Sequence, residues 1–324
     1  MTTSGSVDFE STRNQILIDG LLFANGIEED ETPDNTQLQI ANRFLNRIVK
    51  RLSANFPIWG TIDYTIPLYD LKQTYTLGPS GNKDIDRPLK LTQGRRVVQN
   101  STTETPIFQE SRQTYMELPL KSSQSPVSLF YYDAQLVRGV LHVWGVSNTM
   151  SVSLVDGIAD DWTDSPATPN EYYYTGSDIT TEPTYVFVNG TEQTEGILGS
   201  LAAGEYAWGD QDTLGSDTLY VYQTTDPDSQ AIGWIRVLTT DPDKIIVTAH
   251  RPLSDFDDAD NTADFPQEAE EMLVAQLAVP LSILYDASRY QALKIEAKSL
   301  LDEFLATDIE HASFSISPRS NGRY

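Results

Sequence analysis

The stretch Glu171–Gly190, EYYYTGSDITTEPTYVFVNG, decides how this chain of 324 residues is organised. Its runs EYYY and TYVFV are rich in aromatic and branched residues, which favour strands, and the closing NG is typical of a hairpin turn. Two similar runs follow at Thr218 to Gln223 and Trp234 to Leu238, and glycines lie between them. The spacing predicts a compact antiparallel β module.

This part of the chain is also strongly acidic. From Asn148 to Asp243 there are 17 Asp or Glu against one basic residue, Arg236, so the stretch supplies 16 of the 25 net negative charges. Helical patterns precede it and resume only after Pro266, which indicates an insert in a framework that is split in sequence but folds together in space. The predicted domains are a split core of residues 1–147 and 244–312, an inserted acidic β domain of residues 148–243, and a tail of residues 313–324.

The framework carries four predicted helices. They span Thr12–Ala24 and Thr36–Asn55, and two more start at Pro266 and near Ala287. Pro280 lacks an amide hydrogen, so the third helix should kink or break there. The expected fold class is α+β: a helical bundle of two N-terminal and two C-terminal helices with antiparallel β-strands, interrupted by an inserted all-β domain.

Several short β-type runs belong to the same framework in this interpretation. Ser128 to Tyr132 and Val140 to Val146 are expected to pair as a loose hairpin, and Ile245 to Ala249 is expected to return the chain to the framework. The weaker runs are Ile62–Leu68, Gln73–Leu77, Leu89–Thr92, Arg96–Val98 and Ile107–Gln109.

The composition and charge of the chain argue against several classes of function and site. A net charge of −25 and a pI near 4.3 argue against a general nucleic-acid binder, because phosphate affinity comes mainly from clustered Lys and Arg, although DNA could pass close by without being held. The absence of cysteine excludes disulfides and thiolate metal sites. Since no apolar run approaches the roughly 20 residues that span a bilayer, neither a membrane span nor a secretion signal is expected.

The second predicted helix is amphipathic. Its apolar face, made by Ala41, Phe44, Leu45, Ile48 and Leu52, should enter the core. The other face carries the basic stripe, which consists of Arg43, Arg47, Lys50 and Arg51. Three interpretations stay open for this stripe: it faces DNA, it forms ion pairs with a neighbouring subunit, or it is solvated surface charge.

Residues for catalysis are few, and we expect no catalytic residue, metal site or cofactor. His142 alternates with apolar residues on a strand, which favours packing, and the other two histidines lie in no motif. Two groups of aspartates could act as an acid/base pair or a cation cage, but neither has the calcium-loop pattern; they are Asp160, Asp161 and Asp164, and Asp210, Asp212 and Asp217.

The C-terminal tail alternates apolar and polar residues. Phe314, Ile316 and Tyr324 are its apolar members, and Arg319 and Arg323 lie near them. Such a segment either has no fixed structure of its own or docks into a groove on a partner.

An ordered set of motifs resembles a known family. The two N-terminal helical patterns, then YTLGPSG at Tyr75–Gly81, IDRPL at Ile85–Leu89 and FYYD at Phe130–Asp133, resemble the head-to-tail adaptor proteins of short-tailed bacteriophages, which complete the head and stabilise packaged DNA. After the insert, FPQEA at Phe265–Ala269 is similar to the start of that family's closing helices. Pro183–Tyr222 is similar to a small β module found in phage structural proteins.

The resemblance implies a structural virion protein and not an enzyme. It implies a homo-oligomeric ring, expected to hold twelve copies, that binds below the portal protein, extends the DNA channel, helps retain packaged DNA and offers a surface to the tail hub or nozzle protein. DNA would pass without sequence-specific binding. The ring would be assembled in the host cytoplasm and lie at the head-tail neck of the virion. By the same resemblance, the C-terminal tail docks onto the portal.

An alternative is a virion-associated protein that binds or hydrolyses glycans. Aromatic side chains form platforms for sugars, and the insert places several of them beside carboxylates. These aromatic residues are Tyr172, Tyr173, Tyr174, Trp208 and Trp234.

Overall fold

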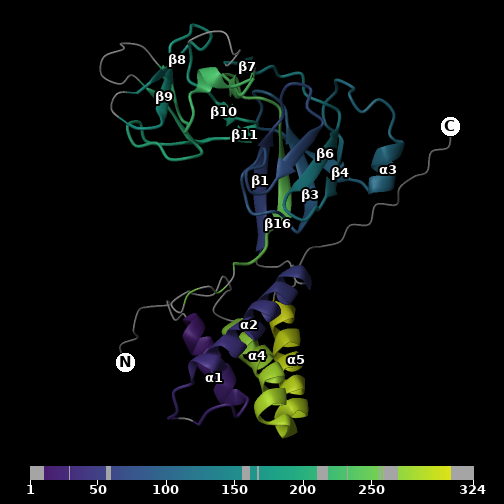
Figure 1. Ribbon diagram of the computed structural model, residues 1–324. Helices are drawn as coiled ribbons and strands as arrows, with labels where there is room; N and C mark the ends of the chain where they lie inside the picture. The colour runs from purple at the N-terminus through teal and green to yellow at the C-terminus, as the bar shows by residue number, and fades with distance from the viewer. Residues whose placement is uncertain are drawn as a thin grey trace, which may run out of the picture. The chain divides into compact units, whose positions relative to one another are not determined.

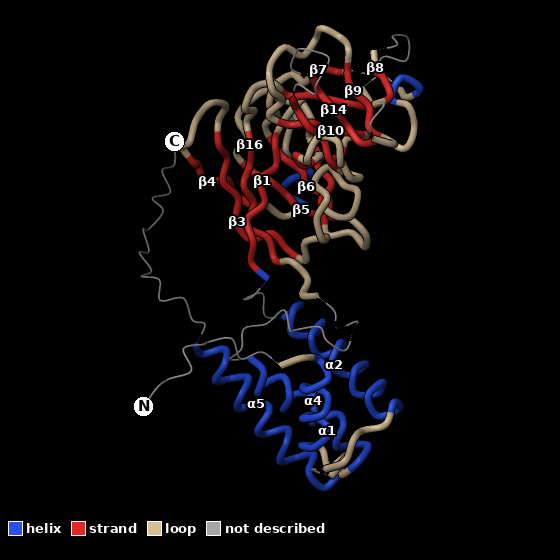
Figure 2. The backbone as a smooth tube through the Cα atoms, turned by 90° about the vertical axis from the view of Figure 1, so that its left-hand side faces the viewer, coloured by secondary structure: helices blue, strands red, loops and turns tan. Residues whose placement is uncertain are grey.

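The fold is seen in a computed structural model (Figure 1), which describes residues 11–28, 30–55, 60–154, 161–165, 168–209, 218–231, 233–254, 256, 258 and 269–307. The chain divides into two compact units. Met1–Trp59 and Leu253–Tyr324 make up the helical unit, and Gly60–Pro252 makes up the β unit. Figure 2 shows the long helices in the first unit and the strands in the second. The boundaries at Gly60 and Pro252 differ from those of the expected core and insert.

The helical unit contains α1 (Arg13–Phe23), α2 (Asn35–Asn55), α4 (Glu270–Tyr285) and α5 (Tyr290–Thr307). A capping box of Thr12 and Gln15 starts α1 and satisfies two backbone amides there. Gly20 lets α1 approach α4 closely, because a Cβ at this position would lie 2.7 Å from Cδ2 of Leu277.

One aliphatic core holds these helices together. Ile16, Leu45, Leu273 and Leu293, one from each helix, are at most 2% exposed. The sequence predicted a kink or a break at Pro280, and a break does not occur, since α4 continues through this residue to Tyr285 and a short 3₁₀ turn then leads into α5. Burial of apolar side chains by all four helices outweighs the lost backbone hydrogen bond.

The β unit begins with a seven-stranded sheet in the order β1-β16-β3-β4-β5-β6-β2. The expected hairpin of β5 and β6 is confirmed, with Leu129 opposite Trp144. The two predicted runs on either side of Gly94 form the single strand β3. The elements are β1 (Thr61–Pro67), β2 (Thr74–Leu77), β3 (Lys90–Val97), β4 (Glu104–Gln109), α3 (Arg112–Glu117), β5 (Leu129–Asp133), β6 (Gly139–Trp144) and β16 (Lys244–His250).

Two smaller sheets complete the β unit. The four-stranded sheet has the order β11-β10-β15-β7, and the five-stranded sheet has the order β12-β13-β14-β9-β8. Their strands are β7 (Val152–Ser153), β8 (Trp162–Asp164), β9 (Glu171–Tyr174), β10 (Tyr185–Val188), β11 (Thr191–Glu192), β12 (Thr194–Glu195), β13 (Glu205–Gly209), β14 (Thr218–Tyr222) and β15 (Ile235–Leu238).

The four-stranded sheet is buried on both faces. Phe187 and Leu238 pack in one core with residues of the seven-stranded sheet. Val186 and Val237, their neighbours along β10 and β15, pack in another core with residues of the five-stranded sheet. Successive side chains of a strand point to opposite faces, so the uninterrupted apolar run of β10 fits this middle position.

The expected fold class was wrong. The molecule is β-rich, with three sheets and five α-helices among the described residues, and it is not a helical bundle interrupted by an all-β insert. The physical reason lies in the core that Tyr75 and Phe130 of the framework share with Phe187 of the expected insert. The framework strands therefore pack with the insert in one β unit, and the helices form a unit of their own.

Candidate functional site

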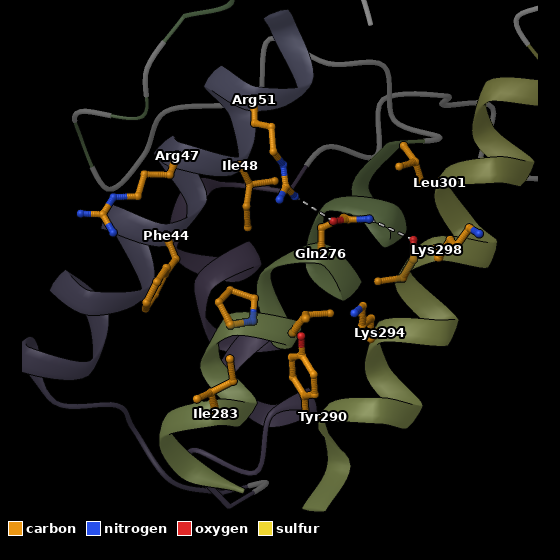
Figure 3. Close-up of a pocket in the computed structure, with 13 residues that line it drawn as sticks. Phe44, Arg47, Ile48, Arg51, Gln276, Ile283, Tyr290, Lys294, Lys298 and Leu301 are labelled. Carbon is orange, nitrogen blue, oxygen red and sulfur yellow. Dashed lines mark hydrogen bonds between the residues drawn. The ribbon is translucent and has the colours of Figure 1, made fainter. Parts of the chain in front are cut away.

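The strongest candidate site is an open groove on the helical unit, which we call the basic groove. It lies among α2, α4 and α5 and has a volume of about 590 Å³ (Figure 3). Of the basic stripe, Arg47 and Arg51 line this groove. Arg43 and Lys50 are exposed on the same helix but are not among the lining residues.

The floor of the basic groove is apolar. Phe44 and Ile48 come from α2, and Ile283 of α4 is 59% exposed. The floor also includes Val279, Pro280, Tyr290, Ala297 and Leu301. The apolar stripe of α2 is thus wider than the area that α4 covers, and part of it faces solvent.

The rim of the basic groove carries four cations: Arg47, Arg51, Lys294 and Lys298. A guanidinium nitrogen of Arg51 donates to Oε1 of Gln276 at 3.1 Å, and Nε2 of Gln276 donates to the carbonyl of Ala297 at 3.0 Å. These two hydrogen bonds, drawn as dashed lines in Figure 3, link the three helices around the groove.

Two of the four rim cations lie over aromatic rings. The guanidinium carbon of Arg47 lies 5.9 Å from the centre of the Phe44 ring, and Nζ of Lys294 lies 5.7 Å from that of Tyr290. Within the described part of the chain, none of the four rim cations forms an ion pair with a carboxylate. An apolar floor with an uncompensated cationic rim suits an acidic, partly apolar protein surface.

A second groove of the helical unit has the opposite charge, and we call it the acidic groove. It has a volume of about 250 Å³ among α1, α4 and α5, and its charged lining residues are Asp19, Glu270, Glu271 and Glu296. The apolar lining includes Phe23, Val274 and Leu300. Burial, and then the nearby charge of Glu270, raises the pKa of Asp19 above its ordinary value.

Glu270 is fixed at one end of the acidic groove. Its two carboxylate oxygens accept hydrogen bonds of 2.7 Å from the backbone amide and the hydroxyl of Ser11. It lies in the first turn of α4, where the positive end of the helix dipole stabilises a carboxylate. Glu271 and Glu296 are exposed.

The sequence interpretation missed two of the four rim cations of the basic groove. Lys294 and Lys298 are four residues apart on α5, and that spacing places both on one helix face. Their pairing with the stripe required knowledge of which face of α5 lies beside α2. The acidic groove was missed for the same reason, because its carboxylates come from three helices.

His142 of β6 has a packing role. Its ring stacks on Tyr131 at 5.4 Å and lies 5.4 Å from the ring of Tyr115. Burial lowers the pKa of His142, and the charge of Arg112 adds to this effect, while Asp133 opposes it.

A polar network holds the turn after β1. Asp70 accepts hydrogen bonds from the amide and the hydroxyl of Ser151, at 2.9 and 2.6 Å, and pairs with the guanidinium of Arg236. Asp70 and Leu71 have φ angles of 51° and 55°, a conformation that the surrounding contacts must stabilise. Lys72 lies within 5.4 Å of two tyrosine rings, and burial lowers its pKa to about 8.

The remaining candidate residues do not form a site among the described residues. The aromatic residues considered for glycan binding pack in or against cores of the β unit: Tyr174, Tyr172, Trp208 and Trp234 in one, and Tyr173 in another. Asp161 and Asp164 flank Trp162 on and beside β8, whereas Asp160, Asp210, Asp212 and Asp217 lie outside the described residues. The expected docking residues of the tail, Phe314, Ile316, Arg319, Arg323 and Tyr324, also lie outside them.

The sequence matches no model of a known protein family, and no curated protein matches it. Among the described helices, none is long and apolar enough to cross a bilayer.

Proposed function

We propose that the chain is a structural subunit of a bacteriophage virion, a head-to-tail adaptor that forms a ring below the portal, extends the DNA channel and offers a surface to the tail. The observation that carries this proposal is the basic groove, an apolar trough whose four cations form no ion pair with a carboxylate of the described residues, on a chain of net charge −25. Such a surface suits protein docking, because a hydrophobic centre with a charged rim is the usual anatomy of an interface.

The residues that carry the resemblance to phage adaptors also support a structural role. In YTLGPSG, the amide of Thr76 donates to Oδ1 of Asn82 at 2.8 Å, and the amide of Asn82 donates to the hydroxyl of Thr76 at 2.8 Å. Nδ2 of Asn82 donates to the carbonyl of Gly190 at 2.6 Å. The motif and the following Asn82 thus form a hydrogen-bonded turn that is joined to the β10–β11 hairpin.

The charge of the chain fits a DNA channel. Like charges repel within a Debye length of roughly 8 to 10 Å, so DNA slides past an acidic wall without being held. A ring built from this chain would confine the DNA and let it leave during ejection.

Electron microscopy of the purified chain mixed with the portal protein of the same phage tests the proposal. We expect a ring of additional density below the portal, with several copies of the chain in contact with one another. A chain that never adds density to the portal would overturn the proposal.

A further inference from the structure

We propose that the basic groove of one copy receives the acidic groove of the next copy, so that the helical units join head to tail. This inference rests on the proposed ring and names the two surfaces that build it. The occupant of the basic groove is therefore a second copy of this chain.

The two grooves lie on opposite sides of the α4–α5 pair. On α4, Glu271 and Pro280 are nine residues apart, and so are Val274 and Ile283; nine residues make about two and a half turns, which places the members of each pair on opposite faces. On α5, Glu296 is two residues from both Lys294 and Lys298 and so points roughly away from them. Two different surfaces that face away from each other are what a head-to-tail contact requires.

The grooves are complementary in charge. Four cations line the basic groove and four carboxylates line the acidic one. Burial raises the pKa of Asp19, and the nearby charge of Glu270 adds to this effect; the cations of a neighbouring copy would offset the repulsion between the two carboxylates. Contact between two basic or two acidic grooves would instead bring like charges together, so the charges select one orientation.

Each groove also exposes large apolar side chains. Ile283 at the basic groove is 59% exposed, and Phe23 at the acidic groove is 42% exposed. Burying these side chains would stabilise the contact, and the charges around them would set its register.

Two charge-reversed variants test the inference. Lys294→Glu/Lys298→Glu leaves the basic groove with two cations and two carboxylates, and Glu271→Lys/Glu296→Lys does the same to the acidic groove; all four side chains are exposed, so we expect both variants to fold. Each variant alone should associate with itself about 100-fold more weakly than the wild type at low salt, measured by sedimentation velocity. The matched control Lys90→Glu/Arg112→Glu makes the same charge change as the first variant at exposed positions outside both grooves and should associate like the wild type.

An equal mixture of the two variants gives the decisive result. At the substituted positions the first variant carries carboxylates in its basic groove and the second carries lysines in its acidic groove, so these positions again have opposite charges, while their unaltered grooves still fit each other. Association should therefore return to within a few-fold of the wild type, with the two variants in a 1:1 ratio by mass spectrometry. A contact between two identical surfaces, the binding of another segment of the same chain, or the docking of a different protein would not give this rescue.

The outcomes separate this inference from the proposed function. If both variants and the wild type join the portal equally well, or if the mixture is as weak as its components, the head-to-tail contact is overturned and the adaptor role stands. If the grooves behave as expected but no density appears below the portal, the contact stands and the adaptor role falls.

Discussion

The helical unit and the β unit use their charges in opposite ways. In the β unit, cations pair with carboxylates of the same unit: Lys83 with Glu192 at 2.5 Å, and Lys244 with Asp241 at 3.1 Å. In the helical unit, the cations of the basic groove and the carboxylates of the acidic groove gather on separate surfaces. Charge satisfied within a unit contributes to its own stability, whereas charge collected by sign on a surface is available to a partner.

The hydrophobic cores of the two units also differ in composition. The core of the helical unit is mostly aliphatic, while those of the β unit contain many aromatic side chains, such as Tyr75, Phe130, Phe187 and Trp162. Aromatic residues bury large areas, and the shared cores on the two faces of the four-stranded sheet tie the three sheets into one body. We therefore expect the β unit to contribute mainly to stability and propose that the helical unit serves in assembly.

The largest effect is expected from Phe130→Ala. Phe130 is fully buried, and the loss of its ring should lower the free energy of unfolding of the β unit by about 3–5 kcal/mol. Tryptophan fluorescence should report this shift, since Trp144, Trp162, Trp208 and Trp234 lie in the β unit, while the helical signal in circular dichroism should melt as in the wild type.

Leu277→Ala is the matched variant in the helical unit. Leu277 is fully buried as well, and its truncation should shift the helical signal and leave the fluorescence transition in place. One shared transition in both variants would break the comparison, because it would mean that the two units unfold together.

Asp70→Asn should have the next largest effect. The change removes the charge that pairs with Arg236 and weakens the hydrogen bonds from Ser151, and we expect a loss of about 1–2 kcal/mol, reduced by the partial exposure of Arg236. Denaturant unfolding followed by fluorescence measures it. Asp86→Asn, at an exposed position of the same unit, serves as the control. An equal loss of stability in both variants would show that the contacts of Asp70 do not stabilise the unit.

His142→Gln should produce a smaller, pH-dependent effect in the β unit. Because the folded pKa of His142 lies below its unfolded value, the unfolded state takes up the proton first, and stability is lost as pH falls through about 6.5. The glutamine variant lacks this loss, so its melting temperature should gain on the wild type between about pH 8 and about pH 5. If the melting temperatures of the two proteins changed equally with pH, the lowered pKa of His142 in the folded state would be contradicted.

Asp19→Asn should produce the smallest effect, with the opposite pH dependence, in the helical unit. The folded pKa of Asp19 is raised, so the ionised form costs stability at neutral pH and this cost disappears as pH falls through the raised pKa. The variant should be slightly more stable than the wild type at neutral pH, and the difference should vanish in acid. Glu303→Gln, exposed on α5 outside the acidic groove, is the control and should show no such gain.

The sequence predicted local structure well where one period dominates. The apolar face of α2 and the strands of the β5–β6 hairpin follow from spacing alone. Long-range pairing could not be predicted: β16 lies between β1 and β3, and β4 pairs in parallel with β5. These pairings decide which core a strand joins, and for that reason the expected fold class was wrong.

The site was predictable in part. Helical periodicity identified Arg47 and Arg51 as surface cations, but the same face includes Arg43 and Lys50, which are not among the lining residues of the basic groove. Which cations of α2 line the basic groove depends on the positions of α4 and α5 in space. The glutamates at the start of α4 also lie beside Asp19 and Glu296, and the sequence of α4 alone does not show this.

The entry and exit of the β unit lie side by side. The amide of Arg251 donates to the carbonyl of Gly60 at 2.7 Å, and Thr61 is paired with His250. Before β1 and β16 pair, a loop of nearly two hundred residues separates the two halves of the helical unit. Their pairing closes this loop, which removes most of the entropy cost of bringing α1 and α2 to α4 and α5. We therefore expect the helices to come together more readily once the strands have paired, and during synthesis α1 and α2 precede α4 and α5 by the length of the β unit.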